Sequence, residues 1–186
     1  MSKYFVLLLV VALGACTGRS PQPTYYTLAA NNDAVAVSQM TGAVDVARVR
    51  IPEYIDRPQM VTTSGVQVNL AQDNRWAEGL APMMQRKLIQ NIGAYLPRTT
   101  VKDANFVAPA GDYAVFVEIY ELNGQLGDMA RMVAAYSITG PASSIKPRTV
   151  QYSAPAGDTY DQYAISVSQM MDKLSRDISN DIATLN

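Results

Sequence analysis

The sequence predicts a single α+β domain, in which a mainly antiparallel sheet carries two helices packed on one face. Two observations lead to this prediction. Segments that alternate apolar and polar residues occur in two groups, and each group is followed by a segment whose apolar residues recur at helical spacing. A chain that runs in the order strands, helix, strands and helix can bury one face of its sheet under both helices.

The first group of strands ends in a hairpin. The expected strands are 25–28, 43–51 with a bulge near 47–48, 59–63 and 66–70. Ser64 and Gly65 separate the last two, and a two-residue connection of this kind is typical of a tight β-turn.

A helix is expected to begin near Arg75, directly after the hairpin. Asp73 or Asn74 provides a side chain that can cap its first turn. Pro82 falls within the first two turns, where a proline is tolerated better than in the middle of a helix. Pro97 marks the end of the apolar helical pattern.

The second group of strands precedes a long terminal helix. The expected strands are 112–122, 129–139 and 148–153. Residues 112–122 are largely apolar on both faces of the strand, which predicts a central strand of the sheet. The terminal helix spans 159–185 with Asp158 or Thr159 as N-cap, and its single apolar stripe is expected to pack on the sheet.

The first residues form a secretory signal with a candidate lipid anchor. Lys3 precedes an apolar run at residues 5–13, which is shorter than the roughly 20 residues that cross a bilayer. The run leads into "LGAC", which resembles a bacterial lipobox with Cys16 as the acylated residue. Cys16 is the only cysteine and cannot form an internal disulfide, so acylation explains it better than a chance cysteine beside an ordinary cleavage site. The expected divisions are a lipoprotein signal peptide at 1–15, the acylated cysteine and tether at 16–24, and a periplasmic domain at 25–186.

The composition argues against an enzyme. The sequence contains no histidine and one cysteine, which excludes Ser–His–Asp triads, Cys–His dyads and imidazole metal sites. No glycine-rich nucleotide-binding motif occurs, so no cofactor is expected. Glu118 with Glu121 and Asp177 with Asp181 fit solvated surface better than a pair of glycosidase carboxylates. Without Lys3 the chain has 14 basic and 16 acidic residues, a balance that argues against a nucleic-acid partner.

The stretch "IPEYIDRP" at 51–58 has two interpretations. Its two prolines restrict the backbone and make a stiff connection that presents Tyr54 and Arg57. In the first interpretation the stretch is only a structural corner between strands. In the second, Tyr54, Arg57, Arg75 and Trp76 form a partner contact, because Tyr, Trp and Arg carry much of the binding energy in interfaces.

Several segments together resemble one family. "YYTL" after the tether, "IPEYIDRPQMVT", "RWAEGL" and the long amphipathic terminal helix occur in this order, and the similarity covers essentially the whole mature chain. This combination resembles the ABC-type transport auxiliary lipoproteins of the PqiC/YmbA-like type. The departures are Met60, where the family more often has a branched aliphatic residue, and Pro82 in the helix.

The resemblance implies a non-enzymatic outer-membrane lipoprotein that faces the periplasm. It implies an MCE-domain membrane protein as partner, phospholipid as cargo and a contribution to membrane integrity. Thr17 follows Cys16, and similarity to enterobacterial-type lipoproteins, in which Asp at this position favours inner-membrane retention, points to the outer membrane.

Two functions remain open at this point. The chain is either an adaptor that docks the MCE partner, or a periplasmic shuttle that carries lipid in an apolar cavity of its own. Nine methionines, the initiator included, suit an adaptable lipid surface or fill gaps in the core. We expect the adaptor to form homo-oligomers, since a ring-shaped or tubular partner presents a symmetric end.

Overall fold

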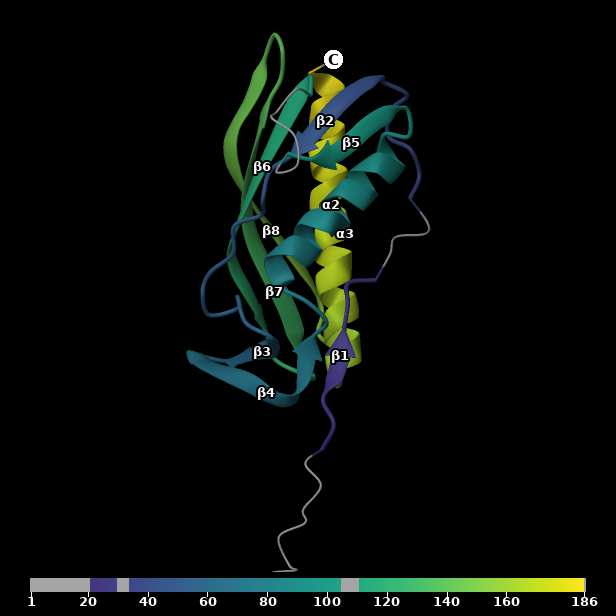
Figure 1. Ribbon diagram of the computed structural model, residues 1–186. Helices are drawn as coiled ribbons and strands as arrows, with labels where there is room; N and C mark the ends of the chain where they lie inside the picture. Colours follow the sequence, from purple (N-terminus) through teal and green to yellow (C-terminus); the bar gives the residue numbers. More distant parts are fainter. Residues whose placement is uncertain (1–20, 30–33, 105–110, 186) are drawn as a thin grey trace, which may run out of the picture.

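The computed structural model describes residues 21–29, 34–104 and 111–185. Within these ranges it contains eight strands and two helices (Figure 1). The strands are β1 (Thr24–Tyr26), β2 (Gly42–Val46), β3 (Gln59–Ser64), β4 (Gln67–Trp76), β5 (Thr99–Asp103), β6 (Tyr113–Gly124), β7 (Met129–Thr139) and β8 (Ser144–Pro155). The helices are α2 (Leu80–Tyr95) and α3 (Tyr160–Thr184). Neither helix is both long and apolar enough to span a bilayer.

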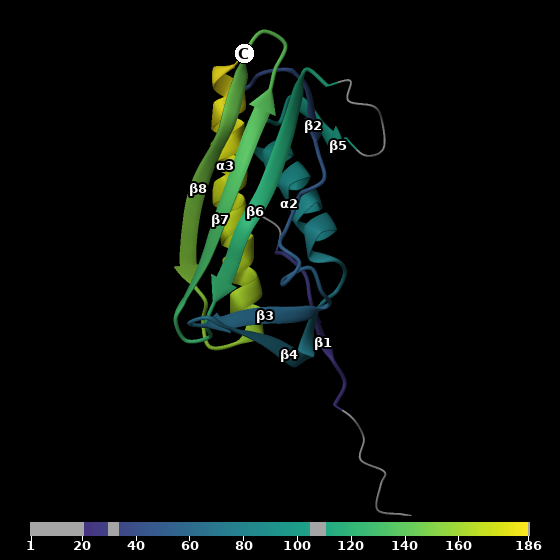
Figure 2. The ribbon, with the colours of Figure 1, turned by 90° about the vertical axis from the view of Figure 1, so that its left-hand side faces the viewer.

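The larger sheet has five strands in the order β5-β2-β6-β7-β8. β2 pairs in parallel with β5 and β6, whereas β6, β7 and β8 form an antiparallel meander. Both helices cover the same face of this sheet (Figure 2). The predicted class, a single α+β domain with two helices on one face of its sheet, is confirmed, and the sheet is mixed because the short strands β2 and β5 run parallel to their neighbours.

The core lies between this sheet and the helices. The central part of the apolar stripe predicted for the terminal helix is fully buried, with Val167, Met170, Met171, Leu174, Ile178 and Ile182 all at 0% exposure. Thr159 caps the helix as predicted: its side chain accepts the N–H of Gln162, and the Gln162 side chain accepts the N–H of Thr159. This reciprocal pair satisfies two backbone donors that the first turn would otherwise leave unbonded.

A second, three-stranded sheet in the order β1-β4-β3 contains the predicted hairpin. Ser64 pairs with Gln67, so the turn residues are Gly65 and Val66, one position later than predicted. Gly65 has a φ of 59°, a left-handed conformation that glycine adopts without a steric penalty. Figures 1 and 2 both show β3 and β4 lying across one end of the larger sheet, the end near which β1 lies.

The predicted start of the first helix was wrong. Residues 74–76 belong to β4 because they pair in parallel with Thr24–Tyr26, and the N–H of Trp76 donates to the carbonyl of Pro58 at 2.8 Å. The helix begins at Leu80 with Gly79 as N-cap and without a side-chain cap. Pro82 is then its third residue, where the N–H that proline lacks would have no helical acceptor.

Two strands differ from their predictions. Strand β2 ends at Val46, just before the bulge that was expected near 47–48. The following segment continues along β6, where the N–H of Ala47 donates to the carbonyl of Val115 and the N–H of Arg50 to that of Val117. Strand β5 was not predicted, because "TTVKD" is too short and polar to show alternation. β6 is central as expected, but only one of its faces is covered, and Phe116 and Tyr120 are 49% and 47% exposed.

Candidate contact surfaces

Tyr54 acts as a structural residue of the proline corner. Its hydroxyl donates to the side-chain oxygen of Asn123 at 2.9 Å and accepts the backbone N–H of Leu122 at 3.0 Å. Burial raises the pKa of this hydroxyl. The hydrogen bond with the Leu122 backbone lowers the pKa by a smaller amount, and the negative charge of Glu121 makes the smallest contribution, which raises it. The corner interpretation therefore describes Tyr54 well, since its polar group is already used inside the protein.

Trp76 is also an internal residue, because only 3% of it is exposed. It lies at the end of β4, opposite Tyr26 of β1. Of the four residues predicted as a partner contact, Tyr54 and Trp76 are thus held by the protein's own structure. Arg57 and Arg75 are half-buried.

Arg57 and Arg75 share an unusual feature. The Nε atom of each is buried, and neither has a hydrogen-bond partner among the described residues. Arg75 pairs with Gln59 across the β3–β4 ladder, and Gln59 lies two residues after Arg57, so the structure brings the two arginines to the same junction of strands. A buried N–H group without a partner is costly. Both residues are only half-buried, so the accessible part of each side chain is a candidate for binding an external acceptor.

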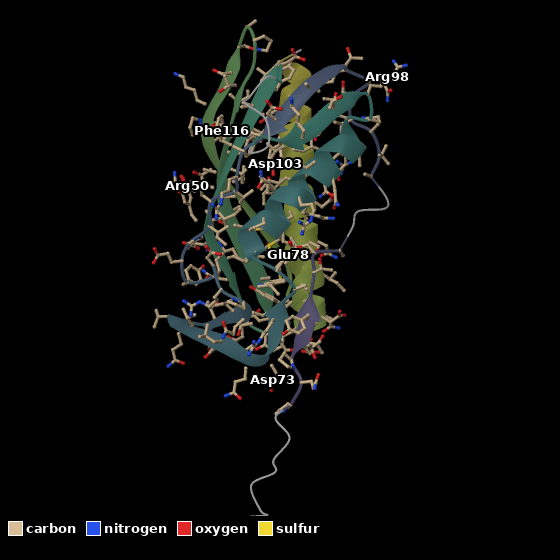
Figure 3. The ribbon with its side chains drawn as sticks, viewed as in Figure 1. Arg50, Asp73, Glu78, Arg98, Asp103 and Phe116 are labelled. Atoms are coloured by element: carbon tan, nitrogen blue, oxygen red, sulfur yellow. The ribbon has the colours of Figure 1, made fainter. Side chains whose placement is uncertain are left out.

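A surface not predicted from the sequence lies on the uncovered face of the larger sheet. A groove with a volume of about 290 Å³ is lined by Arg48, Arg50, Phe116, Glu118, Tyr120 and Pro147, among others. Figure 3 shows Arg50 and Phe116 on the side of the sheet that faces away from the helices. We call this surface the aromatic–arginine groove.

Both arginines of the groove, Arg48 and Arg50, are accessible to a partner. The Nε of Arg50 lies 3.7 Å from Oε1 of Glu118, and the two side chains are 78% and 40% exposed. An ion pair this exposed contributes little, because water and salt screen it. Arg48 is exposed and has no ion-pair partner among the described residues. The groove therefore combines two aromatic rings with two accessible guanidinium groups, the residue types that dominate protein interfaces.

The paired carboxylates of α3 have a role that the sequence did not reveal. Asp181 accepts the hydroxyl of Tyr136 at 2.6 Å and lies 3.2 Å from Nη1 of Arg148, and Asp177 accepts the hydroxyl of Tyr152 at 2.5 Å. Burial, followed by these hydrogen bonds to carboxylates, raises the pKa of both tyrosines above the usual value. These carboxylates were expected to be solvated surface, and they instead attach the terminal helix to β7 and β8.

Two further kinds of site, a metal site and the lipidation site, were considered. Within it, no group of three or more carboxylate, cysteine or histidine side chains is arranged to hold a metal ion. Cys16, the predicted lipidation site, lies outside the described residues.

The comparisons with known proteins define the family. The model of the ABC-type transport auxiliary lipoprotein component matches residues 26–179, and the chain belongs to this family. The family predicted from the sequence is thus confirmed, and membership in it makes this protein an auxiliary lipoprotein. None of the curated proteins matches the chain significantly.

Two solved structures share the fold. A crystal structure of an uncharacterised protein has 20% sequence identity and a TM-score of 0.73, and the alignment covers 87% of this chain and 99% of the other. The crystal structure of protein XCC0632 from Xanthomonas campestris, of family DUF330, has 14% identity and a TM-score of 0.65, with 86% and 94% of the chains covered. At these identities the likeness establishes the fold only.

Proposed function

We propose that this protein is a non-enzymatic outer-membrane lipoprotein, anchored through acyl chains on Cys16, that acts as a periplasm-facing adaptor of an MCE-type lipid transport system. Family membership supports the auxiliary role and the lipid anchor. The lipobox-like "LGAC" supports Cys16 as the acylated residue, and Thr17 supports the outer membrane. In this role the protein contributes to membrane integrity by holding its transport partner at the membrane.

The aromatic–arginine groove is the observation that carries this proposal. An adaptor needs a solvent-exposed surface with residues that bind protein. The groove places Phe116 and Tyr120 beside Arg48 and Arg50 on a sheet face that neither of the two described helices covers. The MCE-domain partner docks there. Homo-oligomerisation follows as part of the proposal, because several copies around a ring-shaped or tubular partner multiply one weak contact.

The lipid shuttle has weaker support. A diacyl lipid needs a large apolar cavity, whereas the space between helices and sheet is occupied by side chains at or near 0% exposure. The aromatic–arginine groove and a second hollow of about 220 Å³ beside Met83 and Lys87 both open to the surface. Phospholipid is accordingly proposed as cargo of the system and not as a ligand enclosed by this chain.

Affinity capture from cross-linked cells tests the proposal. Wild-type protein should capture an MCE-domain membrane protein, and Phe116→Ala with Tyr120→Ala should lose it, because truncated interface anchors each cost about 2 kcal/mol or more. Ile165→Ala is the matched control, since Ile165 is an apolar residue of α3 that is 43% exposed. Absence of any MCE-domain protein from the wild-type capture would contradict the adaptor role. If the double variant still captures the MCE-domain protein, the partner does not dock in the aromatic–arginine groove.

A further inference from the structure

The small sheet β1-β4-β3 carries an unusual share of exposed apolar side chains. Among the described residues nine large hydrophobic side chains are exposed, and four of them belong to this sheet and its turn: Tyr25 at 60%, Val66 at 101%, Val68 at 49% and Leu70 at 46%. Their concentration on so few residues distinguishes this sheet from an ordinary surface, where exposed apolar residues are scattered singly.

The hairpin also lacks charge. Residues 59–72, which form β3, the turn and most of β4, contain no Asp, Glu, Lys or Arg. Soluble proteins commonly protect an exposed edge strand such as β3 with charged side chains, because its free backbone groups otherwise pair with other chains. An uncharged, apolar hairpin is therefore suited to a surface that is covered in the working protein.

Cations stand at the base of the hairpin. Arg57 lies just before the uncharged segment and Arg75 just after it, beyond Asp73, and the buried Nε atoms of both arginines have no partner among the described residues. Arg75 pairs with the exposed Tyr25 on β1. Apolar side chains with Tyr and Arg at their margin match the membrane interface, where tyrosine rings sit at headgroup level and arginines reach phosphate oxygens.

The position of the sheet indicates which surface covers it. β1 is the first strand after the tether, and its first residue, Thr24, is eight positions after Cys16, a reach of at most about 28 Å for extended chain. The hairpin lies across this tethered end of the domain, where Figure 3 also places Asp73 of β4, whereas Arg98 lies at the opposite end. A membrane that holds the acylated Cys16 is within the reach of the hairpin.

We infer that the sheet β1-β4-β3 is a membrane-docking face: Val66, Val68 and Leu70 enter the headgroup region of the phospholipid bilayer, and Arg57 and Arg75 bind lipid phosphates. This inference rests on the proposed lipid anchor and deepens it. Acyl chains alone would leave the domain free to rotate on its tether. Docking through the hairpin fixes its orientation, so that the aromatic–arginine groove is presented to the partner in one direction.

Fluorescence on the acylated protein tests this face. Because acylation uses the only native cysteine, Val66→Cys provides a single thiol for an environment-sensitive nitrobenzoxadiazole label. The protein is reconstituted into vesicles of phosphatidylethanolamine and phosphatidylglycerol, with and without brominated lipid. At position 66 the label should show a blue shift and lose emission with brominated lipid. Val35→Cys is the matched control, because Val35 is 71% exposed and lies two residues before Val37, which bonds to Tyr95 at the end of α2.

The arginines are tested on the same labelled background. Arg57→Gln with Arg75→Gln should reduce the quenching at position 66, whereas Arg98→Gln with Arg131→Gln removes the same charge from exposed sites outside the small sheet and should not. Equal quenching at positions 66 and 35 would overturn the inference. The inference would also be overturned if the label at 66 were shielded from an aqueous quencher but not quenched by brominated lipid. A second copy or a protein partner would then cover the hairpin.

The anchor and the docking face fail in different ways. Co-flotation of the labelled protein with vesicles reports the acyl anchor and therefore the proposed function. Quenching at position 66 reports the docking face. If the protein floats with the vesicles but the label at position 66 is not quenched, the acyl anchor is supported and the docking face is contradicted.

Discussion

The hydroxyl of Tyr54 bridges the proline corner to the end of β6, accepting the N–H of Leu122 at 3.0 Å and donating to Asn123 at 2.9 Å. Leu122 follows the shift in strand register between Ile119 and Glu121. This irregularity returns the Leu122 side chain to the covered face of the sheet, where it is 2% exposed. The corner and the shift therefore stabilise one another, and the two prolines hold Tyr54 in place for this bridge.

Tyr54→Phe should lower the free energy of unfolding by about 1–3 kcal/mol, because it leaves the backbone N–H of Leu122 without its acceptor. Urea denaturation monitored by circular dichroism measures this change. Tyr25→Phe serves as the control, since Tyr25 is 60% exposed and its change should stay within about 0.5 kcal/mol. Equal stability of Tyr54→Phe and wild type would argue that the bridge does not hold the corner.

Leu174→Ala should cost about 2–5 kcal/mol, because the side chain is at 0% exposure in the centre of the α3 stripe and its removal leaves a cavity. Thermal unfolding detects a loss of this size. Ile165→Ala on the same helix is the comparison, because its side chain is 43% exposed. A melting temperature equal to that of wild type would mean that the stripe is not core.

These elements show how far the sequence determines the fold. The stripe of α3 and the alternation of β6 and β7 were predictable, because they extend over many residues with one period. The end of β4 was not, since residues 74–76 take their conformation from pairing with β1, fifty residues earlier in the chain. Here long-range pairing overrode a reasonable local capping signal.

The candidate surfaces were less predictable than the fold. Phe116 and Tyr120 alternate with buried residues in a strand that is largely apolar on both faces, so the sequence alone does not indicate which of the two faces is exposed. Which face the helices leave open depends on how the elements pack. The uncharged stretch at 59–72, by contrast, is visible in the sequence, although its place next to β1 is not.

Alkaline pH should destabilise the protein through Tyr136 and Tyr152. The fold raises the pKa of both hydroxyls, through burial and hydrogen bonds to Asp181 and Asp177. In the unfolded chain tyrosine ionises near pH 10, so above this pH the unfolded state loses protons first and stability falls as pH rises. Tyr136→Phe with Tyr152→Phe should lower stability at pH 7 and flatten its decline above pH 10. A decline as steep as that of wild type would contradict the assignment.

Cys16→Ser should prevent acylation and release the domain from the outer membrane, because two or three acyl chains on one residue provide the stable attachment. Metabolic labelling with palmitate and fractionation of membranes measure both effects. Thr17→Ser leaves the cysteine in place and is the control. Palmitate label and outer-membrane recovery that match wild type in the Cys16→Ser protein would show that the anchor lies elsewhere.

Site-specific photo-cross-linking in living cells tests the adaptor function most directly. A photoreactive amino acid in place of Phe116 lies in the aromatic–arginine groove, and the same group in place of Ile165 lies on the exposed side of α3. The probe at 116 should cross-link to an MCE-domain membrane protein, and the probe at 165 should not. Cross-links at 116 to no protein, or only to proteins without an MCE domain, would contradict it.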